Sequence, residues 1–275
     1  MLKLVGGRVV FEDMILEAEP DNAVLLEVEG GELVLRGVTL RAGRDGIQAR
    51  PDSATGAAPK IRLERSQFTA SRTALGVTEG LVRATRCRFH GRSGLIKAGC
   101  MIDLLGCPDA VFTGCSMGKA TDSSVAVRHS DCLIELSAIR EGLGSGVNLQ
   151  GARTELLGAL ISRNSGEAVA AEHHTRARLA ACEIDRNGIP GEPLFRGLRA
   201  IYGGEFDVLS ADFERTSAAI NTFENGTMRL RRVPGLEPED LYITPLGHVE
   251  YGGQIHDQTP RPKSLSLPAL ERLLT

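Results

Sequence analysis

The sequence predicts an all-β fold, a parallel β-helix solenoid of about eight stacked coils with about 22 residues in each coil. Three observations predict it: a short repeated pattern along most of the chain, alternation of apolar and polar residues around that pattern, and an unusual composition. The chain of 275 residues has 32 glycines, only 4% aromatic residues and no tryptophan. Many glycines and few bulky side chains are typical of a thin core enclosed by many turns.

The repeated pattern is a small residue, a variable residue and a large apolar residue. The large residues of its eight instances are Leu40, Phe68, Phe89, Met117, Ile139, Ile161, Ile184 and Phe213. Successive large residues lie 28, 21, 28, 22, 22, 23 and 29 positions apart. The base period is therefore about 22 residues with three insertions, and a period of this length is typical of a solenoid.

A second strand is expected just before each large residue of the repeat. Five positions before it the sequence has Leu35, Leu63, Ala84, Phe112, Ile134, Leu156, Leu179 and Val208. Seven positions before it the sequence has Leu33, Ile61, Val82, Ala110, Cys132, Thr154, Ala177 and Phe206. Nearly all of these residues are apolar, and a spacing of two indicates a strand with one buried face.

A third strand is expected after each large residue. Seven or eight positions beyond it come Ile47, Leu75, Ile96, Val125, Val147, Val169 and Ile220, and in the coil of Ile184 an insertion delays the equivalent residue to Ile201. Three short strands per coil, joined by turns with Gly, Asn, Ser and Asp, predict a β-helix. A helical solenoid would instead need apolar residues at a spacing near 3.6.

Two segments, LISRNSGEAV (160–169) and CEIDRNG (182–188), resemble the right-handed β-helix repeat. This repeat occurs in pectate-lyase-like enzymes, in periplasmic NosD-type proteins and in the substrate-binding part of some F-box proteins. The resemblance covers roughly residues 33–225 and implies a right-handed, single-stranded β-helix. It implies little about activity, because the repeat reflects the stacking of coils, and the same scaffold carries different functions.

The chain is expected to divide into three parts. Residues 1–32 form an N-terminal cap and a partial first coil, and residues 33–233 form the β-helix. Residues 234–275 are rich in proline and form an irregular tail that ends in a short helix, SLPALERLLT. Caps are expected because the ends of a solenoid are otherwise exposed sheet edges.

Composition and termini predict a cytoplasmic protein without a membrane anchor. The N-terminus has no continuous apolar segment of the kind found in signal peptides, and no stretch of 18 apolar residues occurs. The six cysteines are scattered through a large chain, which indicates reduced thiols and not a disulfide framework.

A group of carboxylates is predicted on one outward face of the last two coils. Glu183 is expected beside Asp212, and Asp185 beside Glu214, because stacked positions in neighbouring coils lie about 4.8 Å apart. Four like charges at this spacing repel one another unless a cation or raised pKa values relieve them. The group is a candidate calcium site, or a candidate catalytic acid/base pair for sugar chemistry. The alternative is a solvated acidic face that Arg186 and Arg215 balance.

A basic surface is predicted nearer the N-terminus. Residues 60–97 contain nine Lys or Arg residues and two Glu residues. Its candidate ligand-binding residues are Arg62, Arg65, Arg83, Arg86, Arg88 and Arg92. Stacked arginines favour a multivalent anion such as an acidic glycan. The alternative is an exposed basic surface that aids solubility. Nucleic acid is disfavoured, because no aromatic residues are interleaved for base stacking.

The insertions are short, which argues against a deep site. Residues 51–59 and 99–108 are expected to leave the solenoid after the third strand, and residues 189–198 after the strand of the repeat. A long, shallow groove suits an extended ligand.

Two functions follow from this pattern. The first is a recognition module without a cofactor, which binds an extended glycan or a protein partner along the solenoid face. The second is a carbohydrate-active enzyme, a lyase, hydrolase or epimerase, that uses the predicted carboxylates. Exposed strand edges at either end also permit a homo-oligomer.

Overall fold

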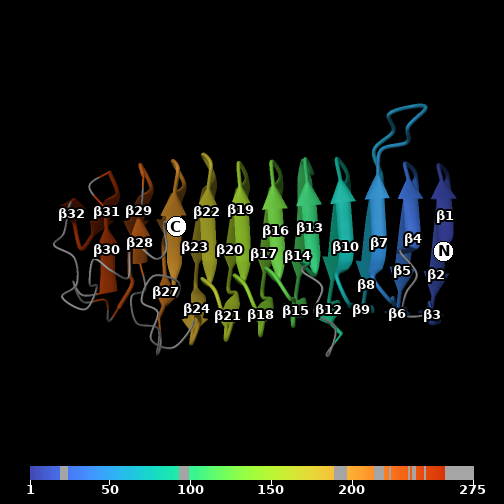
Figure 1. Cartoon of the computed structure of the whole chain (residues 1–275), viewed down its shortest axis with the longest axis horizontal. Coiled ribbons are helices and arrows are strands. Elements are labelled where there is room, and N and C mark those ends of the chain that lie inside the picture. The colour runs from blue at the N-terminus through green and yellow to red at the C-terminus, as the bar shows by residue number, and fades with distance from the viewer. Residues whose placement is uncertain are drawn as a thin grey trace, which may run out of the picture.

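The computed structural model describes residues 1–18, 24–92, 99–188, 197–213, 220–222, 224–234, 236, 240–244 and 246–257. Within these ranges the chain is built of β-strands and contains no α-helix, and it winds into a parallel solenoid of about ten turns (Figure 1). The predicted all-β solenoid is confirmed, with more turns than the eight expected. In the part of the chain that the structure describes, no helix is long and apolar enough to cross a membrane.

The strands form three sheets, each with one strand per coil. Sheet A contains β1 (Leu2–Val5), β4 (Val24–Glu29), β7 (Asp45–Arg50), β10 (Thr73–Thr78), β13 (Ile102–Leu105), β16 (Val125–Arg128), β19 (Val147–Gln150), β22 (Val169–Glu172), β25 (Leu198–Ile201), β28 (Ile220–Thr222) and β30 (Leu241–Ile243). Sheet B contains β2 (Arg8–Glu12), β5 (Glu32–Arg36), β8 (Lys60–Glu64), β11 (Leu81–Thr85), β14 (Asp109–Thr113), β17 (Asp131–Glu135), β20 (Arg153–Leu157), β23 (Arg176–Ala180), β26 (Glu205–Val208), β29 (Thr227–Leu230), β31 (His248–Tyr251) and β32 (Gln254–Asp257). Sheet C contains β3 (Ile15–Glu17), β6 (Thr39–Arg41), β9 (Gln67–Ala70), β12 (Arg88–Gly91), β15 (Ser116–Gly118), β18 (Ala138–Arg140), β21 (Leu160–Ser162), β24 (Cys182–Asp185) and β27 (Ala211–Asp212).

The register between coils is the one that the repeat predicts. On sheet C the large residues pair in the order Leu40, Phe68, Phe89, Met117, Ile139, Ile161 and Ile184. On sheet B the predicted second strand pairs in the order Leu35, Leu63, Ala84, Phe112, Ile134, Leu156, Leu179 and Val208. Strict alternation thus sends every second side chain inward in each coil.

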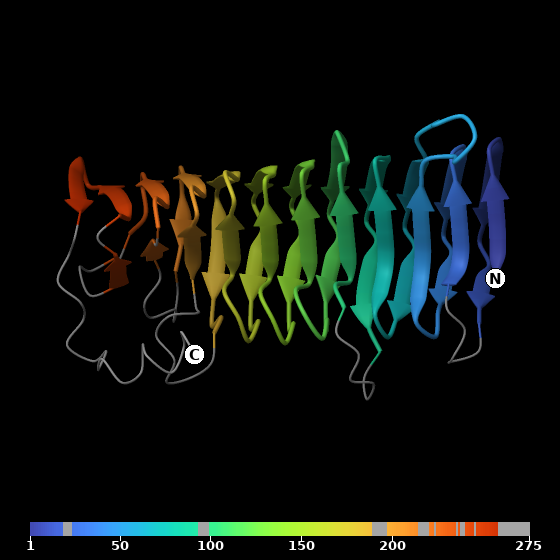
Figure 2. The same cartoon turned by 45° about the horizontal axis from the view of Figure 1, so that its top comes forward.

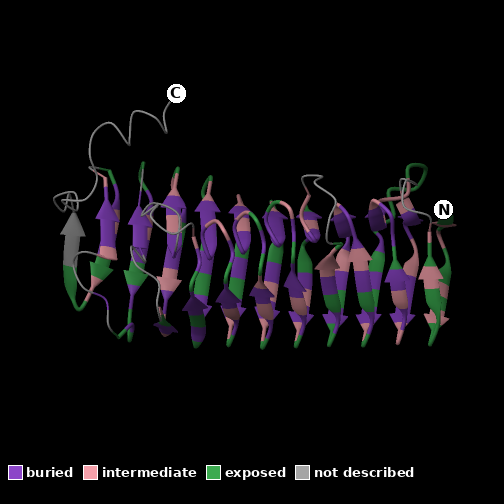
Figure 3. Ribbon diagram, turned by 60° about the horizontal axis from the view of Figure 1, so that its bottom comes forward, coloured by how far each residue is buried: buried purple, intermediate pink, exposed green. Residues whose placement is uncertain are grey.

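The core is a continuous column of these inward side chains. Figure 3 colours the buried residues purple, and they recur in every coil of the middle of the solenoid. Its largest members are phenylalanines of neighbouring coils. The rings of Phe68 and Phe89 stack with centroids 4.9 Å apart and an interplanar angle of 10°. The ring of Phe112 meets Phe89 edge to face at 6.2 Å. Such aromatic pairs add about 0.5–1.5 kcal/mol beyond the burial of their area.

Two predictions for the third strand were wrong. Ile102, and not Ile96, pairs with Leu75, so the extra residues of that coil lie between β12 and β13 and not at 99–108. Ile96 itself lies outside the described residues. In the later coil Leu198 pairs with Val169, whereas Ile201 pairs with Glu172 at an outward position. In both segments an apolar residue that points outward lies close in sequence to one that points inward. The periodicity of the strands does not give the length of the loop between them, so the wrong apolar residue was assigned.

The corner between sheets B and C is built by one residue per coil in the left-handed conformation. In successive coils this residue is Gly37, Arg65, Arg86, Gly114, Leu136, Gly158 and Ala181, with φ between 48° and 62°. Glycine adopts this φ without strain, whereas other residues cost about 1–2 kcal/mol. From Gly37 to Gly158, the backbone N–H of this residue donates a hydrogen bond to a carbonyl of the next coil, as in the 2.9 Å bond from Arg65 to Thr85.

The two ends of the solenoid differ (Figure 2). At the C-terminal end β30 and β31 extend sheets A and B beyond residue 233, and β32 pairs antiparallel with β31. At the N-terminal end β1, β2 and β3 form a complete coil, and each is the edge strand of its sheet. The predicted C-terminal helix falls in residues 258–275, outside the described residues.

Candidate functional site

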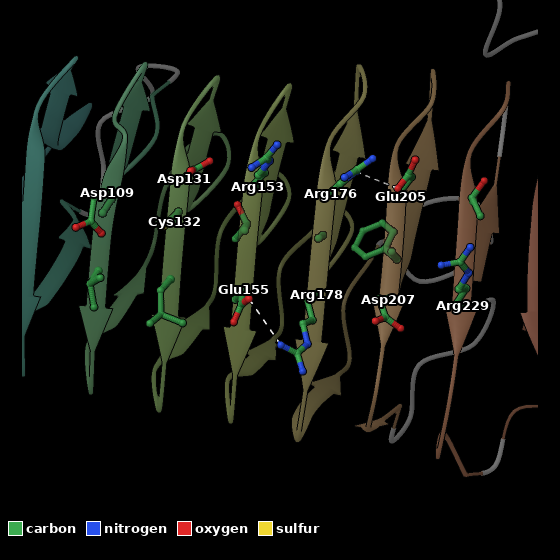
Figure 4. Close-up of a pocket in the computed structure, with 17 residues that line it drawn as sticks. Asp109, Asp131, Cys132, Arg153, Glu155, Arg176, Arg178, Glu205, Asp207 and Arg229 are labelled. Carbon is green, nitrogen blue, oxygen red and sulfur yellow. Dashed lines mark ion pairs between the residues drawn. The ribbon is translucent and has the colours of Figure 1, made fainter.

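A groove of about 790 Å³ runs along the outer face of sheet B (Figure 4). It crosses six coils, from β14 to β29. The residues that line it are Asp109, Ala110, Val111, Asp131, Cys132, Leu133, Arg153, Thr154, Glu155, Arg176, Ala177, Arg178, Glu205, Phe206, Asp207, Thr227 and Arg229. We call this the sheet-B groove.

The groove follows directly from strand alternation. The first and third residues of each strand point outward and form two parallel ridges, while the second residue points into the core. The second residues, such as Ala110, Cys132 and Ala177, are buried and mostly small. The floor between the ridges is therefore backbone with little side chain above it, and it runs parallel to the solenoid axis.

The first ridge carries charges in blocks of opposite sign. Its residues in order are Asp109, Asp131, Arg153, Arg176 and Glu205, and neighbouring members are in register. All five are exposed. Four coil steps of about 4.8 Å make this ridge about 19 Å long, the length of about six residues of extended chain.

The second ridge alternates in sign at every coil in its later part. Its residues in order are Val111, Leu133, Glu155, Arg178, Asp207 and Arg229. Ion pairs connect neighbours: Arg178 lies 3.7 Å from Glu155 on this ridge, and on the first ridge Arg176 lies 3.3 Å from Glu205. Ion pairs this exposed contribute little to stability, about 0–1 kcal/mol each, so the charges are available to a ligand.

The structure brings together only part of the predicted carboxylate group. Glu183 and Asp212 are exposed and pair in register between β24 and β27, as predicted. Asp185 is only 5% exposed, and one of its carboxylate oxygens lies 3.1 Å from Nε of Arg186. Glu214 lies outside the described residues. The catalytic and calcium-binding roles of these residues stay predictions.

Among the described residues, no three or more His, Cys, Asp or Glu side chains are grouped so that they could hold a metal ion.

The arginines of the predicted basic surface are exposed, and some of them form ion pairs with acidic neighbours. Arg62, Arg65, Arg83, Arg86, Arg88 and Arg92 are all exposed. Arg62 stacks in register with Arg83, as predicted. As in the sheet-B groove, these ion pairs lie at the surface: Arg62 lies 3.0 Å from Glu32, and Arg83 pairs with Asp109 at the start of that groove.

The other members of the basic surface face different directions. Arg65 and Arg86 occupy the left-handed corner position between sheets B and C, and Arg88 begins β12 on sheet C. The six arginines therefore spread over two faces and a corner and do not form one pocket. Arg88 also lies beside His90, a half-buried side chain whose pKa is lowered to about 4, mainly by its burial and then by the charge of Arg88.

The cysteines are poor candidates for nucleophiles. All six are free, and five of them are buried. Burial raises the pKa of the Cys132 and Cys182 thiols above the ordinary value, so both are protonated near neutral pH. A protonated thiol is a weak nucleophile and a weak metal ligand.

The sequence interpretation did not single out the sheet-B groove. Its members looked like ordinary exposed charges, because they are spread over more than 100 residues of the chain. A signal was nevertheless present: charges of both signs recur one and three positions before the buried residue of the second strand, as at Glu155 and Arg153 before Leu156. Reading these positions down the coils gives the two ridges.

Comparison of the chain with protein-family models and with curated proteins gives no significant match.

Proposed function

We propose that the protein is a recognition module without catalysis that binds an extended segment of a protein partner in the sheet-B groove. The observation that carries this proposal is the order of charges along the two ridges. An acidic polysaccharide would bring one sign of charge against Asp109, Asp131, Glu155, Glu205 and Asp207. A polypeptide can carry charges of both signs and place each opposite the complementary block of the first ridge. Electrostatic complementarity of this kind favours one partner over others.

The shape of the site supports the same function. The groove is open, shallow and several coils long, whereas sites for small molecules usually enclose most of the ligand. Its floor is backbone between two rows of side chains, which suits an extended chain lying parallel to the solenoid axis. The resemblance to pectate-lyase-like repeats is compatible with this use, because that scaffold also hosts binding functions.

The test uses synthetic peptides as probes. A peptide with a block of lysines, a block of glutamates and a second block of lysines complements the first ridge, and a scrambled peptide of equal composition is its control. We expect the block peptide to bind more tightly, measured by fluorescence anisotropy, with an affinity that falls as salt rises. Equal binding of both peptides would contradict the proposal. So would tighter binding of polygalacturonate or heparin, which would indicate a glycan.

Charge reversal then locates the binding site. Replacing Arg153 and Arg176 with Glu should weaken binding of the block peptide at least about tenfold, because an attractive block becomes repulsive. The matched control is replacement of Arg65 and Arg86 with Glu, which reverses the same number of charges at the corner outside the groove. If the control pair weakens binding and the groove pair does not, the basic surface is the binding site.

A further inference from the structure

Among the described residues, no segment covers the N-terminal end of the solenoid. Strands β1, β2 and β3 are the edge strands of all three sheets (Figure 2). Their inward residues Leu4, Phe11 and Leu16 pack against the core but are only partly buried. A hollow of about 140 Å³, lined in part by Leu4, Phe11 and Leu26, opens at this end. An apolar end with free strand edges is a surface that proteins normally cover.

The backbone groups that face the open end can be identified from the hydrogen bonds to the next coil. Gly7, Asp13 and Met14 direct backbone groups toward the second coil, as does Gly6 in its 2.9 Å bond to Glu29. Residues of a parallel strand alternate in the direction of their N–H and C=O groups. The groups that face the open end therefore belong to Lys3 and Val5 of β1, to Arg8, Val10 and Glu12 of β2, and to Ile15 and Glu17 of β3.

These edge-facing residues are symmetric about Val10. Two positions on either side of it stand Arg8 and Glu12, five positions away stand Val5 and Ile15, and seven positions away stand Lys3 and Glu17. If a second copy meets the first in the antiparallel direction with the two Val10 residues opposite each other, every edge-facing residue meets another edge-facing residue. Arg8 then faces Glu12, Lys3 faces Glu17 and Val5 faces Ile15 of the second copy.

The apolar contacts of this arrangement are also complementary. Val5 and Ile15 are 59% and 63% exposed, and Val10 is 38% exposed. The inward residues are symmetric as well, because Leu4 would meet Leu16 and Val9 would meet Phe11 of the second copy. The two open cores would join into one column, and each buried side chain of this size stabilises the contact by about 1.5–3 kcal/mol if fully covered.

The charged residues at this edge continue an alternation of sign that already exists between the first and second coils. Each charged residue of the edge pairs with an opposite charge in the second coil: Lys3 lies 3.0 Å from Glu29, Arg8 3.0 Å from Glu32, Arg36 2.8 Å from Glu12 and Arg41 3.7 Å from Glu17. Across the junction the sign would alternate again, in the order Glu32, Arg8, then Glu12 and Arg36 of the second copy. Alternation of opposite charges on neighbouring strands stabilises a sheet, and like charges destabilise it.

We propose that two copies of this chain associate head to head through their first coils, with the two-fold axis at Val10. Each edge strand gains an antiparallel partner, β2 with β2 and β1 with β3, so all three sheets run through both copies. The contact is the same surface on both copies and closes after two, so it gives a dimer and not a filament. The sheet-B groove lies on coils far from this end, and the dimer is independent of the proposed binding function.

The mass of the particle is the first test. We expect light scattering after size exclusion to show a dimer for the whole chain. Val10→Lys places two like charges on the axis and should raise the dimer dissociation constant at least about tenfold. The control is Leu136→Lys, which changes an exposed side chain at a corner away from this end and should leave the dimer intact. Circular dichroism verifies that both variants keep their β-structure.

Crosslinking tests the register. Val10→Cys should form an intermolecular disulfide on oxidation, because directly opposite residues of an antiparallel pair lie about 4.5–5.5 Å apart, within the range that a disulfide spans. Arg8→Cys and Glu12→Cys should each fail to crosslink alone and should crosslink when the two variants are mixed. The wild-type chain, with its six native cysteines, is the control for other disulfides.

The proposal is overturned if the wild-type chain is monomeric at every concentration tested. It is also overturned if a dimer forms that Val10→Lys does not weaken. A dimer that dissociates with Val10→Lys but crosslinks through Arg8→Cys alone would contradict the register, and with it the two-fold axis at Val10.

Discussion

The first coil and the coil of Phe89 have the same pattern and a different environment. Both place an apolar residue inward on sheet C, Leu16 in the first coil and Phe89 in the middle. Phe89 is 0% exposed, while Leu16 is only partly buried. The middle coil has a neighbour on each side, and the first coil has one neighbour. In a solenoid a residue owes about half of its burial to each adjacent coil, since contacts reach only the nearest repeats.

The middle of the solenoid also differs from its first coil in how it accommodates buried polar groups. In the middle of the solenoid Asn164 and Asn187 occupy equivalent buried positions, and Nδ2 of Asn164 donates to Oδ1 of Asn187 at 2.9 Å. Asn187 in turn donates to the carbonyl of Ile161 at 2.8 Å. Such a ladder needs adjacent coils on both sides, because a buried amide must have partners for its donors and its acceptor.

The largest expected effect comes from the middle of the core. Phe89→Ala should lower the free energy of unfolding by about 3–5 kcal/mol, because it leaves a cavity between two rings and cannot relax. Phe11→Ala in the first coil should cost clearly less, since its ring is already partly in water. Urea denaturation measures both, in the Val10→Lys background so that association does not contribute. Equal losses would contradict the unequal burial of the two coils.

The amide ladder is expected to give the next effect. Asn164→Ala removes the partner of Asn187 and of the backbone N–H of Gly142, which donates to Oδ1 of Asn164 at 3.0 Å. Leaving buried groups without partners should lower the free energy of unfolding by about 1–3 kcal/mol. Gln67→Ala, at an exposed position of sheet C, is the control and should change stability by less than about 0.5 kcal/mol. An equally large loss for Gln67→Ala would contradict the role given to the buried amides.

A pH effect is expected at His90, an outward residue that neighbouring coils half bury. Its pKa is lowered to about 4 from the ordinary value of 6.5, mainly by burial and also by Arg88, Lys119 and Arg140. The unfolded chain therefore binds a proton that the folded chain does not bind between about pH 6.5 and 4, and stability falls as the pH falls through this window. His90→Gln should remove this part of the pH dependence, measured by urea denaturation at pH 7.5 and 5. Parallel profiles of the two proteins would contradict the shift.

The smallest effect is expected at a corner. Leu136 is 72% exposed and has a φ of 48°, whereas Gly114 and Gly158 occupy the same corner in the coils before and after it. Leu136→Gly relieves strain of about 1–2 kcal/mol and loses about 0.5–1 kcal/mol to chain entropy, so stability should rise slightly. A thermal melt compares it with Leu136→Ala, which keeps the strain. A gain for Ala as large as for Gly would point to the loss of an exposed leucine instead.

Periodicity predicted most of the fold from particular residues. The inward positions of sheets B and C could be placed because their spacing of five holds in every coil, from Leu35 and Leu40 to Leu179 and Ile184. It failed at Ile96 and Ile201, where an insertion separates the strand from the repeat. The spacing of apolar residues does not give the length of the loop. The correct residues, Ile102 and Leu198, are identified by their pairing with Leu75 and Val169.

The candidate site was harder to predict than the fold. The stacked pairs Glu183 with Asp212 and Arg62 with Arg83 were expected from register, and both are present. The near burial of Asp185 and the ion pair of Arg62 with Glu32 were not expected, because they depend on side chains from other coils. The two ridges of the sheet-B groove went unnoticed for the same reason.

Sequence pattern alone is enough to specify the three-stranded coil, its period, its inward residues and the symmetric order of the first coil about Val10. These are local properties, since alternation and spacing act within one turn of the chain. Tertiary structure was needed to show which outward side chains meet, where the insertions leave the solenoid and which described strands stand at the edges of the sheets. Those features depend on residues 20 or more positions apart that stacking brings to about 4.8 Å, and no local pattern specifies them.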